Sequence, residues 1–140
     1  NKAKTEGAEV LLGGKRISDS LFEPTILLNP SSDSLVSKEE VFGPVVCIYE
    51  YNDFDAALKE CNSLPFAFQS AIYTSNIDKA LQFSNEVKAS TVMVNDHTAF
   101  RVDWMPFGGW DDSGIGVGGI PYSMHEMTRE KLTVFKSDML

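Results

Sequence analysis

The sequence predicts an α/β fold built around parallel strands, and two features of residues 44–95 carry that prediction. Apolar runs of strand length alternate there with stretches in which apolar residues recur every three or four positions, as on one face of a helix. Only a few residues connect one element to the next. A β-α-β-α-β order with such short connections implies parallel strands joined by right-handed crossovers.

The first strand and helix of this unit are predicted between residues 45 and 61. Val45 to Tyr51 is an almost continuous run of β-branched, apolar and aromatic residues, typical of a strand covered on both faces. Asn52 and Asp53 indicate the start of a helix, because side chains of this kind cap free backbone N–H groups. The apolar stripe of that helix consists of Phe54, Ala57, Leu58 and Cys61.

A second helix is predicted between two further strands, Gln69 to Thr74 and Thr91 to Asn95. Ser75, followed three residues later by Asp78, resembles a capping box at its start. Its apolar stripe would consist of Ile77, Ala80, Leu81 and Val87. Ligands of open α/β sheets bind at the carboxyl ends of the strands. We therefore expect chemistry near Tyr51–Asn52, Thr74–Ser75 and Asn95–Asp96.

Two more strands are predicted upstream of this unit. Ala8 to Leu12 forms a short apolar run that ends at two glycines. Phe22 to Leu28 forms another run, which contains Pro24 near its start. Because proline cannot donate a backbone hydrogen bond, we expect this second strand at the edge of a sheet.

The residues after Asn95 predict a long loop rich in glycine and aromatic residues. Loops of this length in compact domains are usually functional or disordered. Three aromatic residues, Phe100, Trp104 and Phe107, favour an ordered loop that lines a pocket. A short helix at residues 122–130 and a closing strand from Leu132 to Lys136 would complete the fold.

Composition argues against several classes of function. The 140 residues carry a net charge of −8 and no run of Lys or Arg, which argues against binding to nucleic acid or to an anionic membrane. No window approaches the roughly 18 apolar residues of a membrane span, and the start lacks the apolar core of a signal peptide. We therefore expect a cytoplasmic protein, and the start at Asn1 suggests part of a longer chain.

Several candidate motifs have simpler explanations. Gly114-Ile-Gly-Val-Gly-Gly119 matches a dinucleotide-binding pattern but follows no strand directly and leads into a proline, so close backbone packing is expected. His97 and His125 have no third ligand at metal spacing. Cys47 and Cys61 are expected to be buried, reduced thiols. Glu39 and Glu40 could form an acid–base pair, although adjacent side chains seldom face the same way, and a solvated helical turn is the alternative.

Two stretches resemble the signatures E-x-F-G-P and P-F-G-G-x-x-x-S-G-x-G of the aldehyde dehydrogenase superfamily. They are Lys38-Glu-Glu-Val-Phe-Gly-Pro-Val45 and Pro106-Phe-Gly-Gly109 with Ser113-Gly-Ile-Gly116. Supporting matches occur at Leu12–Lys15, Phe22–Thr25, Val94–Asn95, Met127–Thr128 and Lys131. The resemblance therefore extends over nearly the whole chain.

The resemblance implies a C-terminal part of the catalytic domain, without the Rossmann-like cofactor domain. We expect residues 1–109 to belong to the catalytic domain, residues 110–130 to form a Gly-rich loop and short helix, and residues 131–140 to form a terminal oligomerisation strand and tail. The nucleophilic cysteine and the general-base glutamate of the family would lie upstream. This chain alone is therefore expected to hold no catalytic residue and to be inactive, and its parent to be a homo-oligomer.

The resemblance also assigns roles to four residues. Glu40 matches the glutamate that hydrogen-bonds the nicotinamide ribose of NAD or NADP, and Phe42 matches the phenylalanine beside the nicotinamide. Phe107 matches the wall of the aldehyde pocket. Arg101 stands where many relatives have an apolar or aromatic residue, and its charge would pair either with an anionic substrate or with Asp103. The implied reaction is thiolate attack on an aldehyde, hydride transfer to NAD(P), and release of the acid.

Two departures and two alternatives accompany this interpretation. Phe66-Ala67-Phe68 replaces the usual aromatic-Gly-Leu, and Arg129 stands where a glutamate is common. The chain could instead be a non-catalytic assembly or regulatory module, or part of a CoA-acylating relative. Glu40 and Phe42 argue against the first alternative, because a module freed from catalysis has no physical need of residues that face a cofactor.

Overall fold

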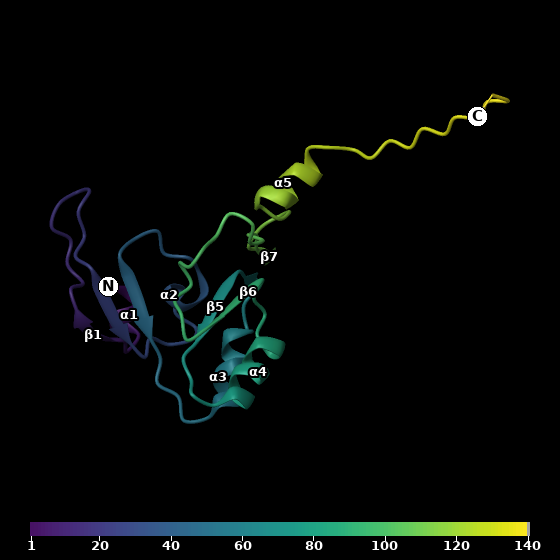
Figure 1. The fold of residues 1–140 in the computed structure, drawn as a ribbon. Coiled ribbons are helices and arrows are strands. Elements are labelled where there is room, and N and C mark those ends of the chain that lie inside the picture. The colour runs from purple at the N-terminus through teal and green to yellow at the C-terminus, as the bar shows by residue number, and fades with distance from the viewer. Residues whose placement is uncertain (140) are drawn as a thin grey trace. The chain divides into compact units, whose positions relative to one another are not determined.

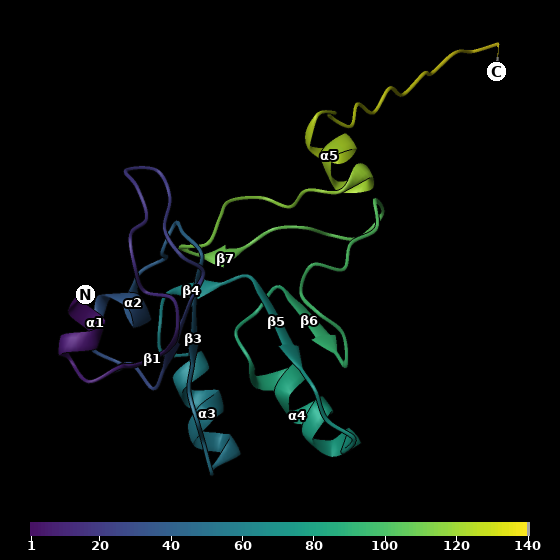
Figure 2. The same cartoon turned by 90° about the vertical axis from the view of Figure 1, so that its left-hand side faces the viewer.

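The computed structural model describes residues 1–139, which fall into two compact units, Asn1–Ala57 and Leu58–Leu140. Figures 1 and 2 show the elements of both units along the chain. The boundary lies inside helix α3, Phe54–Cys61. None of the helices within residues 1–139 is long and apolar enough to cross a membrane.

The first unit contains a three-stranded sheet with the order β1-β2-β3. Its strands are Glu9–Leu12, Thr25–Leu28 and Val45–Ile48. Strand β1 runs antiparallel to β2, with an irregularity between Val10 and Leu12, and β3 runs parallel to β2. Two one-turn helices accompany the sheet, α1 at Lys2–Thr5 and α2 at Leu35–Lys38.

Strand β2 is the central strand of this sheet, so the predicted edge position is wrong. Pro24 precedes the strand, and its missing N–H group therefore costs no hydrogen bond of the sheet. Thr25, the first residue of the strand, donates its N–H to the carbonyl of Pro44 at 2.8 Å. Thr25 and Leu27 are only 5% and 7% exposed, as expected between two neighbouring strands.

Strand β3 is shorter and less covered than the sequence predicts. It ends at Ile48 rather than Tyr51, and its residues alternate between half-buried and exposed. Val46 and Ile48 are the exposed members, at 59% and 41%. Within the described residues, one face of this strand is therefore open, whereas the sequence predicts a strand covered on both faces.

The second unit contains the β-α-β arrangement that the sequence predicts for its last two strands. Strands β5 (Gln69–Ile72) and β6 (Thr91–Val94) are parallel, paired from Gln69 with Thr91 to Ile72 with Val94, and helix α4 (Ile77–Glu86) connects them. The predicted continuous β-α-β-α-β sheet does not form within residues 1–139, because β3 pairs with β2 and has no ladder to β5. The fold is a mixed α/β arrangement of small sheets.

The two longer helices begin at capped ends. The carboxylate of Asp53 accepts hydrogen bonds from the N–H groups of Asp55 and Ala56, at 2.9 and 3.1 Å, which confirms the predicted start of α3. Helix α4 is capped by Asn76, whose side-chain oxygen accepts from the N–H of Lys79 at 3.1 Å. The predicted cap at Ser75 is therefore wrong by one residue.

The buried face of α4 also differs from the predicted stripe. Ala80 is buried as expected, and Val87 at the end of the helix is 8% exposed. Ile77 and Leu81, in contrast, are 68% and 56% exposed, and Phe83 is buried in their place. Residues 80, 83 and 87 therefore face inward, which is consistent with the larger apolar area that an aromatic ring buries.

A two-stranded antiparallel sheet and a short helix complete the second unit. Strand β4 (Phe66–Ala67) pairs with β7 (Trp110–Asp111), and helix α5 spans Ile120–Glu126, so it starts and ends earlier than predicted. The expected strand at Leu132–Lys136 has no paired partner among the described residues. Its apolar members Leu132, Val134 and Phe135 are 89%, 79% and 82% exposed.

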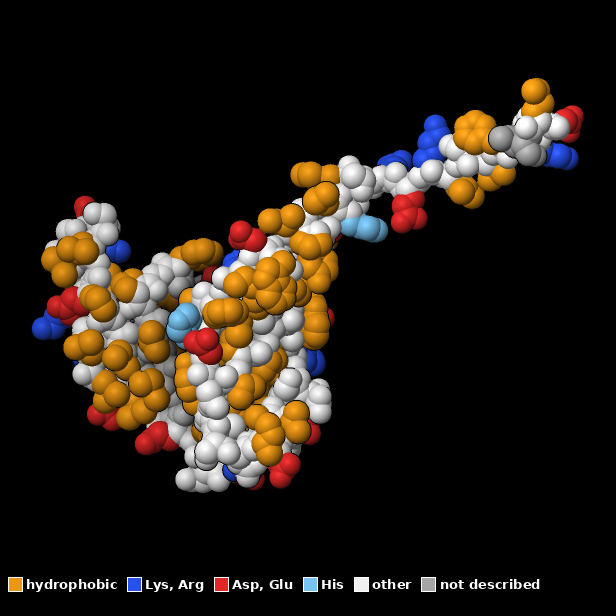
Figure 3. Space-filling view, viewed as in Figure 1, with side chains coloured by type: hydrophobic (Ala, Val, Ile, Leu, Met, Phe, Trp, Pro, Cys, Tyr) orange, Lys and Arg blue, Asp and Glu red, His pale blue; other side chains and the backbone are white. Residues whose placement is uncertain are grey.

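Large apolar side chains reach the surface in both units and along the C-terminal segment, as Figure 3 shows. Phe42, Trp104, Ile115 and Met127 are each at least 72% exposed. Extended apolar surfaces of this kind on a folded chain mark contacts with other protein segments or with ligands.

Candidate functional site

A short extended segment between α2 and β3 presents the two residues assigned to the cofactor. Helix α2 ends at Lys38 and is followed by Glu39, whose backbone is extended, with φ −123° and ψ 146°. Two tight backbone bonds follow, from Gly43 N–H to the carbonyl of Val41 at 2.9 Å and from Val45 N–H to that of Gly43 at 2.8 Å. This compact path turns the side chains of residues 39–42 outward.

An exposed ion pair links two residues of the chain that leads into this segment. The ammonium group of Lys38 donates to the Asp33 carboxylate at 2.6 Å. That hydrogen bond, together with the positive charge of Lys38, lowers the pKa of Asp33 below its ordinary value. Both side chains are exposed, so the pair contributes little to stability.

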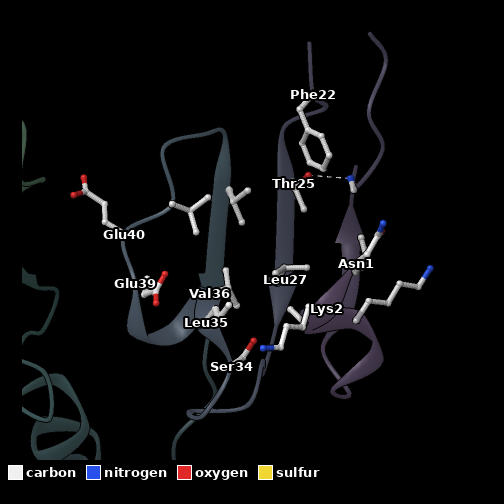
Figure 4. A pocket seen from close by; sticks show the side chains of 16 residues that line it. Asn1, Lys2, Phe22, Thr25, Leu27, Ser34, Leu35, Val36, Glu39 and Glu40 are labelled. Atoms are coloured by element: carbon white, nitrogen blue, oxygen red, sulfur yellow. Dashed lines mark hydrogen bonds between the residues drawn. The ribbon is translucent and has the colours of Figure 1, made fainter. Parts of the chain in front are cut away.

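The two adjacent glutamates lie at the border of a mainly apolar cavity of about 310 Å³ in the first unit. Figure 4 shows that their carboxylates point apart, with that of Glu40 directed away from the other labelled side chains. The carboxylate of Glu40 makes no hydrogen bond or ion pair within the described residues. The arrangement does not bring Glu39 and Glu40 together as an acid–base pair.

Phe42 has its ring almost completely in the open, at 94% exposure. It borders a second cavity of about 510 Å³, together with residues of the Arg16–Phe22 loop. Two residues away, Glu40 offers two carboxylate oxygens as hydrogen-bond acceptors. The two side chains border different cavities of the first unit, one offering hydrogen-bond acceptors and the other an exposed aromatic face.

In the second unit, the carboxyl ends of β5 and β6 are held together by one asparagine. Asn95, at φ +58°, accepts from the N–H of Thr74 at 2.8 Å and donates its amide to the carbonyl of Thr74 at 3.0 Å. Both polar groups of the side chain are therefore used on the backbone. Thr74 and Asn95 lie close together, as the sequence predicts, but here their hydrogen bonds join the two strands.

His97 lies just beyond this junction and organises its own turn. Its Nδ1 accepts from the N–H of Ala99 at 3.1 Å, and its Nε2 lies 3.9 Å from the Asp96 carboxylate. The side chain is 68% exposed. It is a solvated loop histidine.

Arg101 and Phe107, the two residues assigned to the substrate pocket, are in contact. The guanidinium carbon of Arg101 lies 4.1 Å from the centre of the Phe107 ring, within the range of a cation–π interaction. Asp103, the alternative partner, forms no ion pair with Arg101 in the described part of the chain. The backbone carbonyl of Asp103 accepts from Ile120 N–H at 3.1 Å.

Phe68 is a further residue of this site that the sequence reasoning missed. Its ring meets that of Phe107 edge to face, with centroids 5.1 Å apart and planes at 79°. Both rings border a cavity of about 330 Å³, lined mainly by the glycine-rich loop and by Ser123 and Glu126. The one available signal was the departure from the usual aromatic-Gly-Leu pattern at residues 66–68.

The glycine-rich loop is held by close backbone approaches, as predicted. Phe107 and Gly118 exchange two backbone hydrogen bonds, at 3.0 and 2.6 Å. A side chain at Gly109 would collide with the backbone of Ser113. Ser113 in turn accepts from the N–H of Ala67 at 2.9 Å, which ties the loop to strand β4. These contacts fix the position of Phe107.

Neither cysteine has the environment of a nucleophile. Cys47 is half-buried in β3, and Cys61 is exposed at the end of α3, so neither is the fully buried thiol that the sequence predicts. Although Cys61 as a residue is exposed, desolvation of its thiol raises the pKa above the ordinary value, and the neighbouring Glu60 raises it further. The protonated thiol is thereby favoured, which is the opposite of what a reactive cysteine requires.

Comparison with known proteins gives a family match over nearly the whole chain. Residues 1–133 match the model of the aldehyde dehydrogenase family. The chain is 38% identical over 133 residues to 3-sulfolactaldehyde dehydrogenase of Priestia aryabhattai, an alignment covering 95% of this chain and 28% of that protein.

Solved structures of aldehyde dehydrogenases are also similar to this chain. Aldehyde dehydrogenase 21 of Physcomitrella patens, in complex with its reaction product succinate, has a TM-score of 0.85 and 40% identity, over 90% of this chain and 26% of that one. Glyceraldehyde-3-phosphate dehydrogenase of Methanocaldococcus jannaschii, in complex with NADP, has a TM-score of 0.83 and 42% identity, over 90% and 27%. The chain thus spans little more than a quarter of the proteins that it matches.

Proposed function

Because the chain belongs to the aldehyde dehydrogenase family, we propose that it is the C-terminal part of an enzyme that oxidises an aldehyde to a carboxylic acid with NAD or NADP. The observation that carries this proposal is the family match over residues 1–133. The chain spans 28% of a curated relative, so the nucleophilic cysteine and the general base are assigned to the remainder.

Glu40 and Phe42 are the residues that we assign to the cofactor. The bound dinucleotide would supply the hydride acceptor of the reaction. The unpartnered carboxylate of Glu40 would accept hydrogen bonds from the ribose hydroxyls, and the exposed ring of Phe42 would lie beside the nicotinamide. Holding a ring in one orientation raises the rate of transfer because the reacting atoms no longer have to be brought into line.

We assign Phe107 and Arg101 to the aldehyde, and propose that the aldehyde carries an anionic group. Arg101 forms no ion pair in the described residues, so its donors are available, and a guanidinium suits the two oxygens of a carboxylate or phosphate. The names of similar proteins support this: one acts on 3-sulfolactaldehyde, one on glyceraldehyde 3-phosphate, and one holds succinate as its product.

Residues 131–140 form the third part of the proposal. We propose that residues 1–109 belong to the catalytic domain and that residues 131–140 pair with another subunit of a homo-oligomer. The exposed apolar side chains of Leu132, Val134 and Phe135 support this, because an isolated chain gains nothing from presenting them to water.

The test is turnover by the complete polypeptide that carries this chain. Two four-carbon aldehydes, succinic semialdehyde and butanal, differ mainly in the terminal carboxylate, and each is supplied with NAD and with NADP. We expect reduced nicotinamide to accumulate, with a higher kcat/KM for succinic semialdehyde. Absence of turnover with both aldehydes and both cofactors would contradict the enzymatic proposal, and a preference for butanal would contradict the anionic substrate.

A further inference from the structure

Phe68 occupies a fixed position in the backbone of the second unit. It lies between β4 and β5, and its carbonyl accepts two hydrogen bonds, from Thr91 N–H at 3.1 Å and from the Ser90 hydroxyl at 2.8 Å. Its neighbour Ala67 is bonded to Ser113 of the glycine-rich loop. The aromatic ring of Phe68 therefore projects from a rigid junction of two small sheets.

Phe107 brings the second ring to this junction from a distant part of the chain. The N–H and the carbonyl of Phe107 are both hydrogen-bonded to the backbone of Gly118. The ring of Phe107 packs edge to face against that of Phe68, with the ring centroids 5.1 Å apart. Both side chains are more than one-third exposed, at 37% and 38%, so burial alone does not fix their orientation. The edge-to-face geometry does, because the positive edge of one ring attracts the negative face of the other.

The third member of the group is Arg101, whose guanidinium lies over the Phe107 ring at 4.1 Å. In the described residues no carboxylate holds this guanidinium, so the aromatic face is the contact that positions it. A flexible arginine loses side-chain entropy when it binds an anion, and orienting it beforehand removes part of that cost.

We propose that Phe68 is a positioning residue for substrate selectivity: it fixes the ring of Phe107, and that ring holds the Arg101 guanidinium ready for the anionic group of the aldehyde. The inference rests on the proposed role of Arg101. It assigns to Phe68 an effect on anionic substrates only, because a neutral aldehyde of the same size makes no use of the guanidinium.

The experiment compares single and double variants of the complete enzyme with succinic semialdehyde and butanal. Arg101→Leu should lower kcat/KM for succinic semialdehyde by about 30- to 1000-fold and spare butanal. Phe68→Leu, which keeps an apolar side chain but removes the ring, should raise KM for succinic semialdehyde about three- to tenfold with kcat nearly unchanged. Phe68→Tyr keeps the ring and should behave like the wild type.

The double variant and a binding measurement separate positioning from packing. In the Arg101→Leu background, Phe68→Leu should have no further effect on the ratio of the two aldehydes, because the group it orients is gone. Calorimetric titration with succinate should show weaker binding by Phe68→Leu and unchanged binding by Phe68→Tyr. If Phe68→Leu does not fold, Phe68→Met, unbranched and without a ring, takes its place.

The outcomes distinguish this inference from the proposal on which it rests. Equal losses for both aldehydes in Phe68→Leu, with Arg101→Leu still selective, would overturn the role of Phe68 and leave that of Arg101 intact. Equal losses for both aldehydes in Arg101→Leu would overturn the anionic substrate and, with it, the positioning role. Additive effects in the double variant would show that Phe68 acts independently of Arg101.

Discussion

Glu39 and Glu40 show how the backbone alone points two identical neighbouring side chains in different directions. The chain leaves α2 at Glu39 in an extended conformation, in which successive side chains point to opposite sides. Figure 4 shows the consequence, with the two carboxylates pointing apart. Neither carboxylate has a hydrogen bond or ion pair within the described residues, and that of Glu40 is directed away from the other labelled side chains.

Replacing Glu40 should affect hydride transfer more than cofactor affinity. In the complete enzyme, Glu40→Gln keeps the size of the side chain but weakens one or two hydrogen bonds to the ribose. We expect single-turnover transfer to slow by about 5- to 150-fold, equivalent to about 1–3 kcal/mol, because the nicotinamide is less well oriented. Stopped-flow measurement of reduced nicotinamide, beside a titration for Kd, tests this.

Glu39→Gln is the matched control for that substitution. It makes the same chemical change one residue earlier, on a side chain that points elsewhere. Its transfer rate should equal that of the wild type. A Glu40→Gln enzyme with wild-type transfer and a changed Kd alone would contradict the assigned role of Glu40.

Residues of the site could be predicted where a local sequence pattern marked them. They could not be predicted where their position depends on a contact with a distant part of the chain. Phe107 borders a cavity, whereas Phe100, Trp104 and Arg101 are not among the residues that line it, and the role of Arg101 stays a prediction. The edge-to-face contact between Phe68 and Phe107 joins segments that no periodicity connects. Asn76 rather than Ser75 caps α4, and the sequence did not distinguish them because both residue types can cap a helix.

At the scale of elements, local sequence patterns predicted where most helices and strands lie along the chain. They did not predict which strands pair with one another. The cap at Asp53 and the parallel pairing of β5 with β6 follow from short-range patterns. The central position of β2 does not, because it depends on β3, which arrives later in the chain and pairs along its other side. The burial of Phe83 instead of Leu81 on α4 likewise could not be predicted from the local apolar stripe.

The C-terminal segment is the element whose partner is missing from the described residues. We expect Leu132, Val134 and Phe135 to promote self-association of the isolated chain, because an apolar segment with unpaired backbone groups offers an edge for another chain. Truncation after Arg129 should therefore reduce association. Light scattering over a range of concentrations measures the effect.

Point variants separate this effect from the mere loss of residues. Phe135→Ser, within the segment, should reduce association in the same direction as the truncation. Met127→Ser removes a similarly exposed apolar side chain, at 87%, outside residues 131–140 and should change nothing. Equal scattering by the truncated and the intact chain would count against the segment as an association edge.

At the scale of the whole molecule, the open apolar surface and the missing chemistry have the same explanation. Apolar side chains reach the surface in both units, and one face of β3 is uncovered. The matched relatives are more than three times as long as this chain. The proposed larger enzyme accounts for both, because the remainder of its chain would pack on these surfaces and supply the nucleophile.

We therefore expect the 140-residue chain alone to show no dehydrogenase activity. Turnover requires a thiolate nucleophile, and the raised pKa of Cys61 keeps its thiol protonated, while Cys47 is half-buried in β3. Glu40 and Phe42, the residues that we assign to the cofactor, supply no nucleophile. Measured at the absorbance band of reduced nicotinamide, the isolated chain should give no signal above the buffer, whereas the complete polypeptide turns over. Cys61→Ser in the complete polypeptide should leave the rate unchanged, because this thiol takes no part in the reaction; turnover by the isolated chain, or its loss on Cys61→Ser without loss of folding, would place the nucleophile here instead.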